Sequence, residues 1–137
     1  MLVQQPVEDF KVRPIGFITS KLRDLKDCPL QESENAPEAY LELYTSYIQG
    51  LKDTKIGDKL IILTWLHLAN RQILKCHRRN LVGSEEFGVF STRSPDRPNP
   101  IGLHTVTVLE IVSEHKIKIF PMEALNGTPV IDIKPCI

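Results

Sequence analysis

Charged side chains gather in a proline-rich segment at residues 88–103, which reads Gly-Val-Phe-Ser-Thr-Arg-Ser-Pro-Asp-Arg-Pro-Asn-Pro-Ile-Gly-Leu. Each proline fixes its own φ and pushes the residue before it toward an extended backbone. The loop is therefore predicted to be stiff, so that Arg93 and Arg97 lose little conformational entropy when they bind a ligand. Guanidinium groups held in this way are suited to carboxylates or phosphates. The alternative is a rigid surface loop whose arginines are only solvated.

A second segment, Asn-Gly-Thr-Pro-Val-Ile-Asp-Ile-Lys-Pro at residues 126–135, carries a turn signal followed by alternating residues. Asn126 and Gly127 both tolerate positive φ, which predicts a hairpin between strands at Glu123–Leu125 and Val130–Ile133. The alternation predicts Ile131 and Ile133 on the core side, with Asp132 and Lys134 paired on the other face. Because Gly127 has no side chain, a ligand could approach the backbone of this turn closely.

Histidine and cysteine spacing argues against a metal. The four histidines match no zinc-ligand pattern: His67, His77, His104 and His115. The three cysteines are odd in number and form no Cys-x-x-Cys pair: Cys28, Cys76 and Cys136. We expect no metal and no disulfide framework. His67 ends a predicted buried strand, where a core histidine is the alternative to a ligand contact.

A basic cluster, His77-Arg78-Arg79, lies in a segment that also holds Arg71 and Lys75. Such a cluster is either a solvated turn or a phosphate-contacting patch. The chain as a whole has 17 Lys and Arg against 17 Asp and Glu, so its net charge is zero. Any nucleic-acid contact must therefore be local, and a binder that relies on an overall positive field is excluded.

The elements that position these groups are predicted to be short strands. Ten prolines and seven glycines divide the chain, and the apolar residues between them alternate more often than they follow a helical period. The predicted strands, besides the two of the hairpin, are Val12–Thr19, Ala39–Tyr44, Lys59–His67, Ile73–Cys76, Phe87–Ser91, Gly102–Val112 and Lys116–Phe120. Lys59–His67 is apolar on both faces, which is typical of a central strand, and Thr45–Leu51 is predicted to be a helical turn. The pattern favours a mostly β protein, either a small β-barrel or a curled antiparallel sheet with short helical turns.

Length and composition set the remaining limits. A chain of 137 residues with 42% apolar residues fits one domain with a single core. Its longest apolar run, Leu60 to Leu66, is far shorter than the roughly 20 residues of a membrane helix. Acidic residues near the N-terminus do not fit a signal peptide. We therefore expect a cytoplasmic protein that does not span a membrane.

Three segments together resemble a known family: Pro-Ile-Gly-Phe-Ile-Thr-Ser at 14–20, the stretch at 90–103, and Gly-Thr-Pro-Val-Ile-Asp-Ile-Lys-Pro at 127–135. They are similar to the YaeB/TsaA-like family of TrmO-type tRNA methyltransferases. The resemblance implies an enzyme that uses S-adenosylmethionine to N-methylate a threonylcarbamoyl-modified adenosine next to the tRNA anticodon. It further implies a homodimer, and one YaeB/TsaA-like domain over 1–137 without a C-terminal extension domain.

The resemblance also implies site residues. Its cofactor contacts fall on Pro29, Leu30, Gln31, His67, Leu68, Arg93, Leu103, Asn126, Gly127, Thr128 and Pro129. For the substrate we expect Arg78, Arg79 and Arg97, and no catalytic residue is assigned. Leu30 stands where the family has an arginine, and Ile-Gly-Asp-Lys at 56–59 replaces the family's Gly-Phe-Ser-His.

These departures keep two other functions open. The chain could be a noncatalytic β-barrel that binds S-adenosylmethionine or RNA, or a methyltransferase for a different small substrate. Transfer of a labelled methyl group to tRNA distinguishes the first function from both alternatives.

Overall fold

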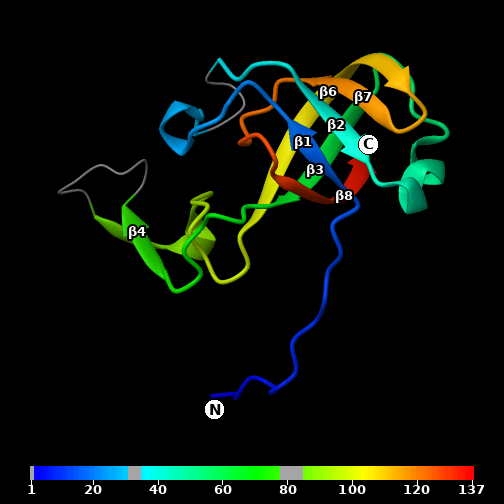
Figure 1. Cartoon of the computed structure of the whole chain (residues 1–137). Helices are drawn as coiled ribbons and strands as arrows, with labels where there is room; N and C mark the ends of the chain where they lie inside the picture. Colours follow the sequence, from blue (N-terminus) through cyan, green and yellow to red (C-terminus); the bar gives the residue numbers. More distant parts are fainter. Residues whose placement is uncertain (1, 31–34, 78–84) are drawn as a thin grey trace.

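The centre of the protein is a closed β-barrel in the computed structural model, which describes residues 2–30, 35–77 and 85–137 (Figure 1). Six antiparallel strands follow one another around the barrel in the order β1-β2-β7-β6-β3-β8, and β8 closes the ring by pairing with β1. Their bounds are Gly16–Thr19 (β1), Ala39–Leu43 (β2), Lys59–Trp65 (β3), Ile101–Ser113 (β6), Lys116–Phe120 (β7) and Pro129–Pro135 (β8). The predicted mostly β fold with a small barrel is confirmed.

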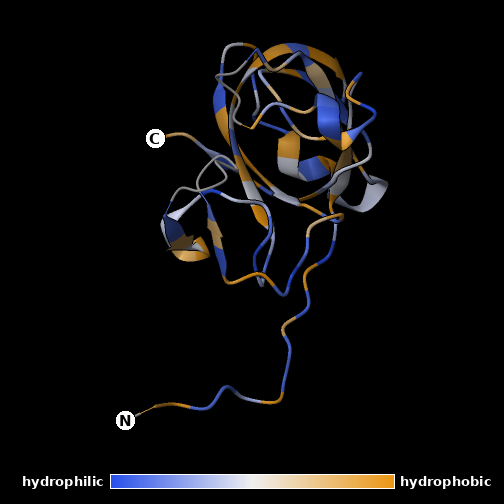
Figure 2. Cartoon of the chain, turned by 90° about the vertical axis from the view of Figure 1, so that its left-hand side faces the viewer, coloured by the Kyte–Doolittle hydropathy of each residue, from blue (hydrophilic) through white to orange (hydrophobic). Residues whose placement is uncertain are grey.

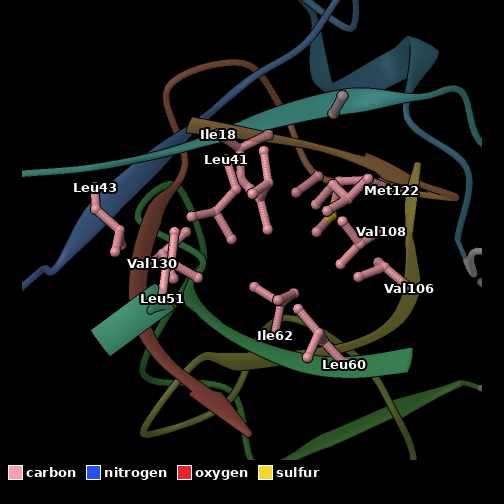
Figure 3. Packing of buried hydrophobic residues seen from close by; sticks show 14 residues of the cluster. Ile18, Leu41, Leu43, Leu51, Leu60, Ile62, Val106, Val108, Met122 and Val130 are labelled. Carbon is pink, nitrogen blue, oxygen red and sulfur yellow. The ribbon is translucent and has the colours of Figure 1, made fainter. Parts of the chain in front are cut away.

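Alternate residues of each barrel strand fill the interior. In β3, Leu60, Ile62 and Thr64 are buried, while the residues between them are half-buried on the outer side. Figure 3 shows the buried side chains of facing strands converging, with Ile18 and Leu41 on one side and Ile62 on the other. Because burial of apolar area is the main favourable term in folding, this cluster supplies most of the stability of the barrel.

Two predicted strands begin or end within a few residues of the observed bounds. The first begins at Gly16 instead of Val12, because Pro14 has no N–H to donate to a neighbouring strand. The residues before it form an exposed arm that runs away from the barrel (Figure 2). The central strand ends at Trp65 instead of His67. The Leu66 N–H still donates to Pro100 O at 2.8 Å, but Pro100 has no N–H to continue the pairing.

Two further predicted strands lie outside the barrel. β4 (Lys75–His77) and β5 (Glu86–Gly88) pair with each other as a separate two-stranded sheet, which lies beside the barrel in Figure 1. The predicted bounds, Ile73–Cys76 and Phe87–Ser91, are therefore wrong in detail. The chain leaves β5 at the buried Val89, where a short 3-10 helix η4 (Val89–Ser91) begins.

The predicted hairpin at residues 123–133 is wrong. Residues 123–125 form no strand, and the turn at Asn126 packs on β1, with the Gly127 N–H donating to Ile18 O at 2.7 Å. β8 pairs with β1 and β3, and a bulge at Leu63 and Thr64 makes Ile131 an extra residue. The predicted core position of Ile133 is therefore confirmed, whereas Val130 packs in the core in place of the predicted Ile131. The predicted pair of Lys134 with Asp132 is present at 3.1 Å.

Short 3-10 helices complete the described chain. The predicted helical turn is η2 (Thr45–Leu51), which places Leu51 against the core, and η1 (Leu25–Asp27) lies in the connection between β1 and β2. In the described ranges no helix has the length and apolar character needed to cross a membrane.

Candidate functional site

Three connections meet at one end of the barrel and enclose a pocket. They join β1 to β2, β3 to β6, and β7 to β8, and the antiparallel pairing brings all three to the same end. The pocket has a volume of about 620 Å³, which is within the range of small-molecule and cofactor sites. The barrel thus forms its floor, and the loops form its walls.

The pocket brings together most of the predicted cofactor residues. Those that line it are Pro29, Leu30, His67, Leu68, Arg93, Leu103 and Thr128. Asn126, Gly127 and Pro129 do not line it, and Gln31 lies outside the described residues. Of the predicted substrate residues, Arg97 lines the pocket, whereas Arg78 and Arg79 lie outside the described residues. Segments far apart in the sequence therefore form one site.

The proline-rich loop is braced from both sides. The Asn70 N–H donates to Asp96 Oδ1 at 2.8 Å, and Arg71 Nε donates to Pro98 O at 2.6 Å. The Arg71 guanidinium also lies 5.1 Å from the ring centre of Trp65. Within the loop itself, Arg97 donates to the carbonyls of Val89 and Thr92. Arg71 and Arg97 thus hold the backbone of the loop in place.

Arg93 differs from these arginines because its side chain is exposed at the pocket. Among the described residues it has no hydrogen bond or ion pair. Phe90, also on this loop, is 81% exposed and lines the same pocket. A cation and an aromatic ring are therefore both available to a ligand here.

The turn at residues 126–128 connects the pocket floor to the first loop. Asn126 Oδ1 accepts a hydrogen bond from the Ser20 N–H at 2.9 Å, and Gly127 has φ 86°. Thr128 is buried, and its hydroxyl donates to Leu125 O at 2.6 Å. Asn126 and Gly127 therefore shape the turn, and Thr128 is the member that reaches the pocket.

His67 is exposed at the pocket, so the alternative of a buried core histidine is wrong for this residue. The buried histidine is His104 on β6. From the sequence, this residue was considered only as a zinc ligand, and no zinc pattern was found. No group of three or more His, Cys, Asp or Glu in the described ranges is placed to hold a metal ion.

His104 belongs to a buried polar network at the pocket floor. Its Nε2 lies 2.7 Å from the hydroxyl oxygen of Thr64 on β3, and its Nδ1 is in contact with Oε1 of Glu123. Glu123 is only 8% exposed, yet it lines the pocket together with His104. Oε2 of Glu123 is buried and has no hydrogen-bond partner in the described part of the chain.

Sequence reasoning missed Glu123, His104, Thr64 and Phe90. A signal for His104 was present in the sequence. Gly102, His104 and Val106 are spaced two residues apart on one strand, so their side chains share its inward face. A polar residue at such a position needs a buried partner. Its partners could not be found from sequence, since they come from β3 and from the connection after β7.

Cys28 is a titratable group on the pocket wall. Burial raises the pKa of its thiol, and the negative charges of Asp27 and Asp24 raise it further. Its sulfur also lies 3.6 Å from the backbone carbonyl of Asp24, as a thiol donor would. Cys28 is therefore a protonated, weakly nucleophilic side chain at neutral pH.

A small closed antiparallel barrel with a cofactor-sized pocket at its end defines the structural class of this protein. Residues 17–137 match the family described as the tRNA-methyltransferase O N-terminal domain, and the chain belongs to this family. The expected family is therefore confirmed.

Archaeal relatives match nearly the whole chain. It is 35% identical over 127 residues to a probable S-adenosyl-L-methionine-binding protein of Methanothermobacter thermautotrophicus, covering 93% of this chain and 90% of that protein. It is 37% identical over 123 residues to the S-adenosyl-L-methionine-binding protein of Archaeoglobus fulgidus, covering 90% of this chain and 86% of that protein.

The fold is also similar to a solved structure. The crystal structure of TrmO from Pseudomonas aeruginosa superposes with a TM-score of 0.75 and 28% sequence identity, over 96% of this chain. The chain spans 58% of that TrmO chain.

Proposed function

We propose that this protein is an S-adenosylmethionine-dependent methyltransferase that acts on tRNA and N-methylates a threonylcarbamoyl-modified adenosine next to the anticodon. The pocket is the observation that carries the proposal. It gathers Pro29, His67, Arg93 and Thr128, to which the family resemblance assigns the cofactor, at one end of the barrel. Membership of the tRNA-methyltransferase O family supports the same activity.

The pocket residues fit S-adenosylmethionine. Leu66, Phe90 and Leu125 offer apolar and aromatic surface for the adenosine, and the exposed guanidinium of Arg93 suits the carboxylate. The buried Oε2 of Glu123 is an acceptor without a partner among the described residues, as expected of a site that receives a ligand. When bound, the cofactor supplies a methyl group that is already activated. The chain then has to hold and orient its ligands, and a braced loop suits that task.

Exposed groups at the pocket support a nucleic-acid substrate. An exposed aromatic ring such as Phe90 can stack on a nucleobase, and such stacking is worth about 1–3 kcal/mol per base. Arg78 and Arg79 are proposed as phosphate contacts, because Arg71 and Arg97 already bind backbone carbonyls of the loop. Binding to tRNA would then depend on salt through a small number of phosphates.

A second candidate function is binding of S-adenosylmethionine without methyl transfer. The archaeal relatives favour it, since they are described as S-adenosyl-L-methionine-binding proteins without a named reaction. In this case the pocket would serve the cofactor alone.

Incubation with methyl-labelled S-adenosylmethionine and tRNA tests the proposal. We expect label on tRNA that carries the threonylcarbamoyl group and none on tRNA from cells unable to add that group. Equal labelling of both tRNA pools would contradict the proposed acceptor. Cofactor binding without label on either pool would contradict methylation of tRNA and leave the second candidate and a methyltransferase for a small substrate.

A further inference from the structure

A carboxylate at the floor of the pocket has one buried oxygen without a hydrogen-bond partner among the described residues. Oε1 of Glu123 is in contact with His104 Nδ1, but Oε2 has no hydrogen-bond partner in the ranges that the structure describes. Glu123 is 8% exposed and lines the pocket. A buried charged acceptor without a donor is costly, so the bare protein is less stable for having it. A group that is costly to the fold and borders a ligand pocket is a candidate for ligand binding.

The protons of the network determine what the free oxygen requires. An ionised carboxylate only accepts hydrogen bonds, so the proton of the Glu123–His104 contact belongs on Nδ1 of His104. When His104 is neutral, its Nε2 accepts a hydrogen bond from the Thr64 hydroxyl, 2.7 Å away. In that state the network carries the single negative charge of Glu123. A positively charged ligand group would balance that charge.

We propose that the Glu123 carboxylate pairs with the positively charged sulfonium of S-adenosylmethionine and lets the pocket discriminate this cofactor from S-adenosylhomocysteine, whose sulfur is neutral. This inference rests on the proposed function, because it assumes that S-adenosylmethionine is the ligand. Glu123 is then a cofactor-binding residue in addition to those that the family resemblance implies.

The location of Glu123 favours the sulfonium over the other cation of the cofactor. The ammonium group is on the same carbon as the carboxylate, for which the exposed Arg93 is available, so that end of the cofactor belongs at the exposed part of the pocket. Glu123 is buried, with the apolar Ala124 and Leu125 next to it on the pocket wall. A sulfonium is weakly hydrated, and its polarised C–H groups are weak donors, so it costs less to bury beside a carboxylate than an ammonium.

His104 and Thr64 act as positioning residues in this account. Thr64 fixes the ring of His104, and His104 holds one oxygen of Glu123, so that the position of the other, buried oxygen is fixed as well. His104→Asn keeps a donor close to the position of Nδ1 and should retain the preference for S-adenosylmethionine. His104→Leu removes that donor and should weaken the preference.

Calorimetric titration of the full chain with S-adenosylmethionine and with S-adenosylhomocysteine tests the proposal. The wild-type protein should bind the charged cofactor more tightly. Glu123→Gln keeps the shape of the side chain and removes its charge, so it should weaken binding of S-adenosylmethionine about tenfold or more. Binding of S-adenosylhomocysteine should change less than about threefold, because its neutral sulfur forms no charge pair with the carboxylate of Glu123. Glu110→Gln, the same change at an exposed site on β6, should alter neither affinity.

The outcomes separate the inference from the proposed function. An equal loss of affinity for both ligands in Glu123→Gln, or no loss for either, would overturn the sulfonium contact while leaving cofactor binding intact. A wild-type protein that binds S-adenosylhomocysteine as tightly as S-adenosylmethionine would overturn it without any variant, should Glu123→Gln fail to fold. A wild-type protein that binds neither ligand would contradict the proposed function itself.

Discussion

Arg93 and Arg97 lie on the same loop but have different contacts. We therefore expect one alanine variant to lose cofactor affinity and the other to lose stability. Arg93 is exposed at the pocket, so Arg93→Ala should weaken cofactor binding by about 1.5–3 kcal/mol, the range for hydrogen bonds to charged groups. The free energy of unfolding of Arg93→Ala should equal that of the wild-type protein. Arg97 donates to two loop carbonyls, so Arg97→Ala should lower the free energy of unfolding by about 1–3 kcal/mol.

Calorimetry and denaturant unfolding on both variants check this contrast. Unchanged cofactor affinity in Arg93→Ala would remove Arg93 from the site. A loss of stability in Arg93→Ala equal to that in Arg97→Ala would show that both arginines hold the loop.

Cys28 should react slowly with thiol reagents near neutral pH. Burial, with help from Asp27 and Asp24, raises its pKa, so the thiolate fraction at a given pH is smaller than in a free cysteine. The pH midpoint of alkylation by iodoacetamide, followed by peptide mass mapping, should lie above that of cysteine in an unstructured peptide. Asp27→Asn should move the midpoint down only in part, because the burial remains. A midpoint at or below that of the peptide would contradict this account.

At the scale of residues, sequence reasoning found the exposed part of the site and missed its buried part. Arg93 and Thr128 were identified because they belong to unusual local motifs, and both line the pocket. Glu123 belongs to no such motif, and its importance depends on a histidine from another strand. Local patterns carry no information about a contact of this kind.

At the scale of elements, Gly102 allows β3 and β6 to bring Thr64 and His104 together. It is the register partner of Thr64, and a Cβ at this position would overlap Thr64 Oγ1 and lie 2.7 Å from His104 Nε2. Gly102→Ala should therefore force the network apart and lower the free energy of unfolding by about 1–3 kcal/mol, as overpacking does.

Gly88→Ala is the matched control for this prediction, because a Cβ there meets no atom within 4 Å. Thermal or denaturant unfolding of both variants gives the comparison. If Gly102→Ala were as stable as Gly88→Ala, Thr64 and His104 would have to move apart without cost, and this prediction would be wrong.

Strand positions were predicted better than strand partners. Lys116–Phe120 was predicted with the observed bounds, since its alternation of charged and apolar residues is a local property. The hairpin at Asn126 and Gly127 was wrong because the turn signal is equally local, whereas β8 pairs with β3, which lies far earlier in the chain. The bulge that moves Ile131 out of the core is likewise set by pairing with β3.

At the scale of the whole molecule, closure of the barrel creates the site. Predicted strands and a resemblance were sufficient for the fold class and for a set of candidate residues. The pocket itself needs the three connections at one end of a closed ring, which depends on long-range pairing. The expected homodimer stays a prediction, which light scattering of the protein in solution can test.

Amide chemical shifts of the isotope-labelled chain, recorded during titration with S-adenosylmethionine, test the central claim most directly. The account predicts that the largest changes fall on the pocket walls, at Phe90, Thr128 and the non-proline residues of 28–30, 66–69, 92–97, 101–104 and 123–125. Residues around Gln49 and Glu114, which line a smaller depression elsewhere, should change little. Changes confined to that depression or to the exposed arm before β1, or no changes at saturating cofactor, would contradict the assignment of this pocket as the cofactor site.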